Sequence, residues 1–146
     1  MAITSAICNS FKQEVLQAIH NFTATSGNTF NLALYTSSAT LNKSTTAYTT
    51  SNEISNTSGS AYTAKGKALT SVTPALSGDT AVCDFADVSF TSASFTANGC
   101  LIFNDSASGD PAVCAIAFGS DKTVTSGTFT IQFPTADASD AIIRIA

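Results

Sequence analysis

Residues 29–36 read TFNLALYT, and this stretch decides the fold class. Phe30, Leu32 and Leu34 would lie on one face of an extended chain, and the side chains between them would lie on the other face. An alternation with a period of two is typical of a β-strand, in which successive side chains point to opposite faces. The stretch therefore predicts a strand over residues 29–36.

Similar strand patterns follow at short, regular spacing along the rest of the chain. The predicted strands cover residues 62–73, 80–85, 88–91, 94–104, 112–119, 128–133 and 141–145. Turn-forming sequences separate several of them, as in LSGD at 76–79 and SGDP at 108–111. Many short strands punctuated by turns favour a mainly β fold, an antiparallel β-sandwich with a jelly-roll-like arrangement. The polar segment 37–60 is interpreted as a long, weakly structured loop, in which the isolated apolar residues Leu41, Tyr48 and Ile54 act as pins to the core.

The residues before this sheet predict one N-terminal amphipathic helix. Ser5 is a suitable N-cap, and apolar side chains follow it at spacings of three and four. The apolar set is Ile7, Cys8, Phe11, Val15, Ala18, Ile19 and Phe22. We predict a single domain over 1–146, in which residues 1–28 form the helix and its loop and residues 29–146 form the sandwich.

Composition disfavours several classes of protein. The 146 residues are 44% hydrophobic and 11% charged, with a formal net charge of −4. The basic residues are scattered singly, which offers no patch for nucleic acid, and no apolar run approaches the ~18 residues of a membrane span. The first six residues lack the basic and apolar regions of a signal peptide. We therefore expect synthesis in the cytoplasm, with no nucleic-acid partner and no membrane.

His20 and the cysteines are interpreted as structural residues. His20 is predicted to lie on the polar side of the helix near its end, where the helix dipole favours a proton. Cys8, Cys83, Cys100 and Cys114 show no Cys-x-x-Cys spacing, which disfavours zinc-ribbon and thioredoxin-like sites. A hairpin centred near Ala107 would place Cys100 opposite Cys114. A disulfide between them is possible, but buried free thiols are favoured.

Acidic residues occur in pairs that could in principle carry chemistry. The pairs are Asp84 with Asp87, Asp105 with Asp110, and Asp137 with Asp140. We considered glycoside hydrolysis for these pairs and calcium binding for the second, and we favour turn formation, in which the carboxylate binds its own backbone. No Gly-x-Ser-x-Gly motif is present. We therefore predict no enzyme, and no catalytic, cofactor-binding or metal-binding residues.

Several stretches of the chain resemble one family of proteins. They are LALYTS at 32–37, TSNEIS at 50–55, GSAY at 59–62, ADVSF at 86–90, GCLIFN at 99–104, FGSDKTV at 118–124 and AIIRI at 141–145. Together they resemble small structural virion proteins of tailed bacteriophages, described as decoration, cement or tail-associated proteins. The resemblance covers most of the chain, and its motifs are structural rather than chemical. It implies a protein of the phage particle.

The leading hypothesis is a capsid decoration (cement) protein on the capsid surface of the virion. Its expected partners are the major capsid protein and further copies of itself, as a homotrimer or homodimer. The expected contact regions are residues 37–60 and Met1–Phe22, although the helix could equally pack on its own sandwich. The alternatives are a tail, neck or fibre component, and a carbohydrate-binding module that uses Tyr35, Tyr48 and Tyr62.

Overall fold

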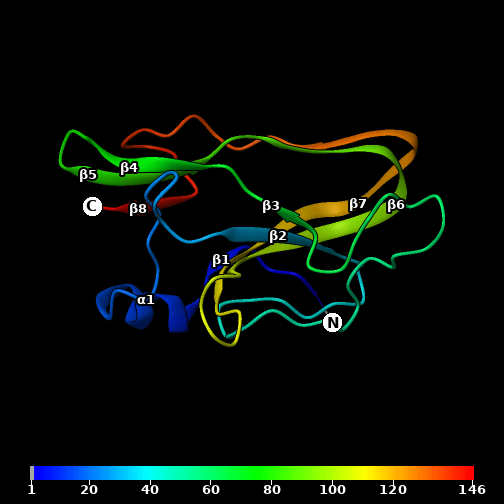
Figure 1. Cartoon of the computed structure of the whole chain (residues 1–146), viewed down its shortest axis with the longest axis horizontal. Helices are drawn as coiled ribbons and strands as arrows, with labels where there is room; N and C mark the ends of the chain where they lie inside the picture. Colours follow the sequence, from blue (N-terminus) through cyan, green and yellow to red (C-terminus); the bar gives the residue numbers. More distant parts are fainter. Residues whose placement is uncertain (1) are drawn as a thin grey trace.

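The computed structural model describes residues 2–146, and its architecture is mainly β (Figure 1). Its elements are β1 (Ala6–Ile7), α1 (Asn9–Leu16), β2 (Phe30–Tyr35), β3 (Lys67–Ala68), β4 (Ser71–Ser77), β5 (Thr80–Phe85), β6 (Val88–Asn104), β7 (Ala112–Ile131) and β8 (Ile143–Ile145). Within residues 2–146, a larger sheet has the order β1-β7-β6-β2-β3 and a smaller sheet has the order β4-β5-β8. Every pairing between these named strands is antiparallel, as predicted, whereas the jelly-roll arrangement is not confirmed.

The longest strands, β6 and β7, form a hairpin that curls back over itself (Figure 1). Ala97 pairs with Lys122 and Gly99 pairs with Ala117, so residues 118–121 of β7 bulge out at the bend. Bulges of this kind bend a strand and increase its local twist. We call residues 112–117 the inner half of β7 and residues 122–131 its outer half. The inner half lies beside β1, whereas the outer half, still paired with β6, returns above the rest of the larger sheet (Figure 1). We call the outer half of β7 together with residues 88–97 of β6 the outer layer.

This curl corrects two strand predictions. Residues 88–91 and 94–104 were expected to be separate strands, and so were 112–119 and 128–133, but each pair is one continuous strand. Of the intervening residues, Ser92 and most of 120–127 are polar and exposed, whereas Ala93 is buried. Ala93, 122–124 and 127 still pair across the hairpin, so neither strand ends at these residues. Elsewhere, the predicted strand 80–85 coincides with β5, 62–73 is divided between β3 and the start of β4, and 141–145 contains β8.

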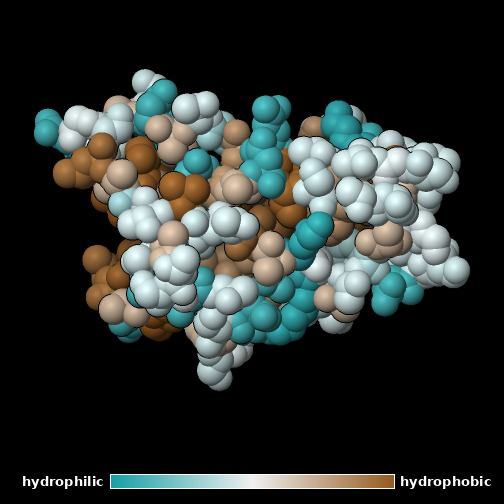
Figure 2. All heavy atoms as spheres, turned by 45° about the horizontal axis from the view of Figure 1, so that its top comes forward, coloured by the Kyte–Doolittle hydropathy of each residue, from teal (hydrophilic) through white to brown (hydrophobic). Residues whose placement is uncertain are grey.

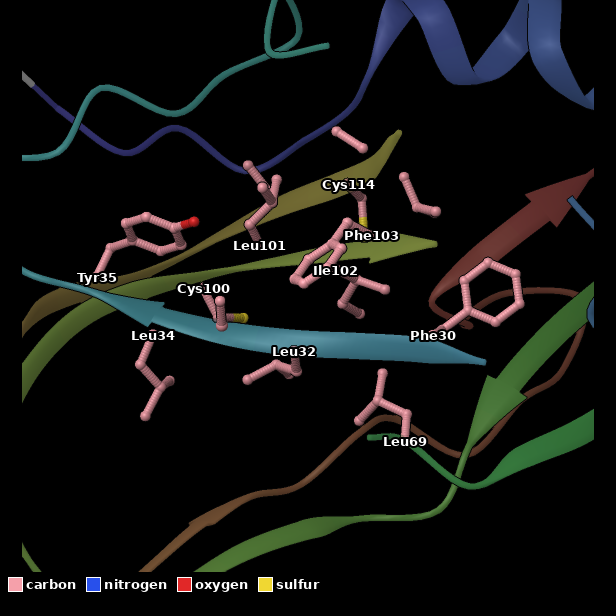
Figure 3. Packing of buried hydrophobic residues seen from close by; sticks show 14 of the residues in the cluster. Phe30, Leu32, Leu34, Tyr35, Leu69, Cys100, Leu101, Ile102, Phe103 and Cys114 are labelled. Carbon is pink, nitrogen blue, oxygen red and sulfur yellow. The ribbon is translucent and has the colours of Figure 1, made fainter. Parts of the chain in front are cut away.

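The core lies on both faces of β2. Figure 3 shows Leu32 and Leu34 on one side of this strand, and Tyr35 on the other side with Leu101. Every residue of β2 except Asn31 is buried, because the outer layer covers one face and the N-terminal segment with residues 37–60 covers the other. The predicted strand 29–36 is therefore confirmed to within one residue at each end, as the central strand of a layered fold.

The N-terminal helix is shorter than predicted. α1 covers only Asn9–Leu16 with Cys8 at its N-cap, and Ser5 instead accepts a hydrogen bond from the Ala117 N–H (2.9 Å). Ala18 adopts a left-handed conformation (φ 58°), which stops helical continuation. Phe22 then stacks on Phe30 of β2, with ring centroids 4.3 Å apart. The helical spacing of residues 18–22 was misleading because this segment packs in an irregular conformation against the aromatic core.

The segment 37–60 contains no named helix or strand, as expected, and the burial of Leu41 and Ile54 confirms two of its three expected pins. Ala39, Leu41 and Ile54 are buried, and Leu41 forms a β-bridge with Ile3. A second bridge joins Tyr35 to Glu53. These contacts hold the segment against the face of the larger sheet that lies away from the outer layer (Figure 1).

Candidate functional site

A hydrogen-bond network centred on Glu53 holds the long segment before β3 in place. The Glu53 carboxylate accepts hydrogen bonds from the Tyr48 hydroxyl (2.6 Å), the Tyr62 hydroxyl (2.7 Å) and the Lys65 backbone N–H (2.8 Å). The Tyr62 hydroxyl also accepts from the Leu34 N–H (2.9 Å), so it links Glu53 to the central strand. Burial and the hydrogen bond to Glu53 raise the pKa of Tyr48 to about 12 and the pKa of Tyr62 well above its usual range.

The network continues through the side chain of Lys65. Its ammonium lies 2.7 Å from Asp105 Oδ1 and 2.8 Å from Asp110 Oδ2, and these carboxylates raise the pKa of Lys65. The ammonium also lies 5.7 Å from the centre of the Tyr48 ring. One oxygen of each carboxylate thus binds the Lys65 ammonium, which is the cation at this site. This contact corrects the interpretation of Asp105 and Asp110 as turn residues bonded to their own backbone.

Of the other paired acidic residues, Asp84, Asp87 and Asp137 accept hydrogen bonds from backbone N–H groups. Asp137 Oδ1 accepts hydrogen bonds from the N–H groups of Ser139 (2.7 Å) and Asp140 (2.8 Å), which lower the pKa of Asp137. This geometry confirms the turn interpretation for Asp137. Asp84 likewise accepts from the N–H of its neighbour Phe85, and Asp87 accepts from the distant Phe133 N–H (2.8 Å).

His20 is buried, and this corrects its predicted place on the polar side of the helix. Its Nε2 lies 2.7 Å from Glu14 Oε2, and its Nδ1 lies 3.2 Å from Asn104 Nδ2. Asn104 Oδ1 accepts from the N–H groups of Ser106 and Ala107, which orients the Asn104 amide so that Nδ2 faces His20. Nδ1 therefore acts as the acceptor, and Nε2–H donates to Glu14. The arrangement ties the N-terminal segment to the end of β6.

All four cysteines are buried free thiols, as the sequence favoured. Cys100 pairs with Ile116 and Cys114 pairs with Ile102, so the predicted face-to-face placement of the two cysteines was wrong by two residues. The turn supplies one residue of this offset, because Phe103 pairs with Ala112 and not with Pro111, and a register shift between Ile102 and Phe103 supplies the other.

The aromatic residues considered for sugar binding do not form an open platform. Tyr35 is 0% exposed and Tyr62 is 1% exposed, while Tyr48 stacks on Phe103 with ring centroids 4.8 Å apart. Sugar stacking requires an accessible ring face, so these three side chains serve the core and the Glu53 network instead.

An apolar groove of about 760 Å³ lies between the two halves of β7, beside β1. Its lining includes Ile7, Ile116, Phe118, Phe129, Ile131 and Ile142. Pockets of this size and character are typical binding sites. Sequence reasoning missed the groove because it depends on the curl of the hairpin, which brings residues 116 and 129 to one place. The alternation in residues 128–133 was the available signal, but it predicts only a strand.

Metal ligands and membrane-spanning helices were also considered. Within the part of the chain that the structure describes, no cluster of three or more His, Cys, Asp or Glu residues is arranged to hold a metal ion. Among residues 2–146, no helix has the length and apolar character needed to cross a membrane.

No family model matches the chain, and comparisons with curated proteins and with solved structures return no match.

Removing the Glu53 carboxylate should destabilise the protein strongly. We expect Glu53→Ala to lower the free energy of unfolding by about 4 kcal/mol, because three donors lose a charged acceptor. Tyr48→Phe removes one of these hydrogen bonds and should cost about 1.5 kcal/mol. Urea unfolding of both variants measures the difference, and equal losses would contradict the central role of Glu53.

Proposed function

We propose that this chain is a structural protein of a bacteriophage virion, a capsid decoration (cement) protein that binds the assembled head shell. In this proposal it lies on the capsid surface, with the major capsid protein as its partner, and associates with itself as a homotrimer or homodimer. The resemblance of its sequence to small virion proteins over most of the chain supports the proposal, and so do two surface features.

The observation that carries the proposal is an apolar surface at the end of the molecule where α1 and the smaller sheet lie. We call it the apolar end and define it by Leu16 (87% exposed), Ile19 (38%), Val72 (46%), Leu76 (75%) and Ile145 (59%). Figure 2 shows hydrophobic side chains gathered at this end of the molecule. Exposed apolar patches mark surfaces that bind other proteins. Leu16 and Ile19 belong to the N-terminal segment that the sequence proposed as a contact region.

The second support is the rigidity of the other proposed contact region. Residues 37–60 are held against the larger sheet by Glu53 and by buried Leu41 and Ile54. A surface held in place before binding loses little conformational entropy when it docks. The short hydroxyl side chains that dominate this segment also have little rotamer freedom to lose.

The proposed mechanism is thermodynamic linkage. A protein that binds the assembled shell, and binds its separated subunits less well, stabilises the shell by mass action. The stabilisation of the shell grows with the concentration of free decoration protein relative to its dissociation constant. No bond is made or broken, so the surfaces of the protein carry the function.

The test uses phage particles with and without this protein. Particles from a phage that lacks its gene should release DNA at a lower temperature, and adding back the purified protein should restore the rupture temperature. The variant Leu16→Ser with Leu76→Ser should restore it poorly, whereas the control Thr63→Ala with Thr91→Ser, at exposed sites outside the apolar end and outside residues 37–60, should restore it fully.

Two results would overturn the cement proposal. One is an unchanged rupture temperature in particles that lack the protein. The other is a reconstruction of the particle that places the protein in a few copies at the tail or neck instead of across the head.

A further inference from the structure

The outer half of β7 exposes an unpaired backbone edge. Among residues 2–146, the strand that pairs with β7 on the side away from β6 is β1, and it reaches only Cys114 and Ala115. Residues 122–131 pair with β6 alone. Their second edge therefore presents N–H and C=O groups with no strand opposite them, which is a template for pairing with another chain.

The two layers of the sandwich end at different places beside this edge. The larger sheet continues past the inner half of β7 to β1, whereas the outer layer stops at the outer half of β7. The apolar groove lies in the space that this difference leaves, with Ile7 and Ile116 from one layer and Phe129 and Ile131 from the other. A strand added to the edge of the outer half would lie over β1 and complete the outer layer.

The other strand edges are partly covered or carry features that discourage pairing. Residues 88–97 of β6 have no second strand beside them, but the segment 60–67 lies along this edge, where the Ser94 N–H donates to the Ser60 carbonyl and the Lys67 ammonium donates to the Ser89 carbonyl. β4 contains Pro74 and a register shift, β3 is two residues long and begins with Lys67, and β8 is three residues long and contains Arg144. Prolines, charges, irregularities and short strands are the usual means of protecting an edge. Residues 123–131 (TVTSGTFTI) contain no charge and no proline. The outer half of β7 is therefore the edge suited to a partner strand.

We propose that the outer half of β7 is a dimerisation edge, which pairs antiparallel with the same residues of a second copy of this chain. The proposal deepens the self-association part of the proposed function. Antiparallel pairing of one edge with itself has two-fold symmetry, the commonest symmetry of protein dimers. The contact joins the two outer layers into one continuous sheet.

Charge favours a second copy as the occupant. The chain is acidic overall, with a net charge of −4, yet the proposed edge is uncharged except for Lys122 at its beginning. Two-fold antiparallel pairing places the two copies of Lys122 at opposite ends of the ladder, so no like charges face each other. Each copy also brings Val124, Phe129 and Ile131 toward the groove of the other, and one contact closes both grooves.

The experiment measures the molar mass of the full chain by sedimentation equilibrium over a range of concentrations. Thr125→Lys with Thr128→Lys places two charges on the exposed edge strand, where they would face the same charges of the second copy. The control, Ser58→Lys with Ser108→Lys, adds the same charge at exposed sites away from this edge. Circular dichroism and thermal melts verify that both variants are folded.

We expect the unmodified chain and the control to be dimers and the edge variant to dissociate at least tenfold more readily. Hydrogen exchange should also show amides of 122–131 that become protected as the concentration rises. A monomer at every concentration, a trimer, or an edge variant that dimerises as well as the control would overturn the proposal. Occupation of the edge by an extended segment of a capsid protein would appear as protection of 122–131 only on heads, with a monomer in solution.

The two proposals can fail separately. The rupture-temperature test reports on binding to heads through the apolar end, and sedimentation reports on the β7 edge without any phage particle. An edge variant that is monomeric but still restores the rupture temperature would leave both proposals standing as independent surfaces.

Discussion

Gly66→Ala is expected to destabilise the fold by roughly 3–5 kcal/mol, a large fraction of the stability of a domain this size. Gly66 has a positive φ (68°), and a Cβ atom at this position would lie 1.8 Å from the carbonyl oxygen of Leu32. Leu32 belongs to the central strand and is fully buried, so its backbone cannot move aside without disturbing the core. The turn before β3 would have to leave the sheet.

Gly59→Ala is the matched control for this prediction. Gly59 also has a positive φ (85°), but a Cβ atom there would meet nothing within 4 Å. Backbone strain alone should cost about 1 kcal/mol at both sites. Denaturant unfolding of the two variants therefore separates the steric clash from the strain, and similar losses of stability would contradict the close approach of Gly66 to β2.

The second large effect is expected in alkaline solution. Burial raises the pKa of Cys8 to about 11 and that of Cys83 to about 12, from an ordinary thiol value of 9.0, and raises the pKa of Cys100 and Cys114 as well. Above pH 9 the unfolded chain releases thiol protons that the folded chain keeps. Stability from this source is fully present below pH 9 and is lost as the pH rises toward the folded-state values.

The number of buried thiols sets how much unfolding free energy is lost in alkaline solution. Each thiol should contribute a loss of about 1.4 kcal/mol between pH 8 and pH 10, so the four together should remove about 5 kcal/mol. Guanidinium unfolding at intervals of pH, with a reductant present, measures this slope. The variant Cys100→Ala with Cys114→Ala should show about half of it, whatever its stability at neutral pH. A free energy of unfolding that stays constant up to pH 10 would contradict the prediction.

Local patterns predicted the strands whose side chains face the core. The alternation in residues 29–36 and the short run at 80–85 correspond closely to β2 and β5 because both strands are packed against buried neighbours. The same reasoning divided β6 and β7, since it depends on runs of large apolar side chains and the residues between the predicted strands, 92–93 and 120–127, are mostly small or polar. Backbone pairing across a hairpin leaves no apolar pattern on a strand that faces solvent.

The candidate site was harder to predict because its contacts join distant residues. Asp105 and Asp110 were noticed as a pair in one turn, but nothing local indicated that Lys65, 40 residues before Asp105, supplies their cation. Glu53 was noticed only as part of a resemblance, and its three donors come from both sides of it in the chain. His20 was misplaced because the helix was extended past Ala18, where the chain leaves the helical conformation.

The curled hairpin has a consequence for how the molecule comes apart. The two layers are stretches of the same two strands, joined by continuous backbone through the bulge at residues 118–121. The two layers cannot separate unless the curled hairpin straightens. Straightening would expose the whole hydrophobic core to water in one step. Heat or denaturant should accordingly melt both layers together as one cooperative unit.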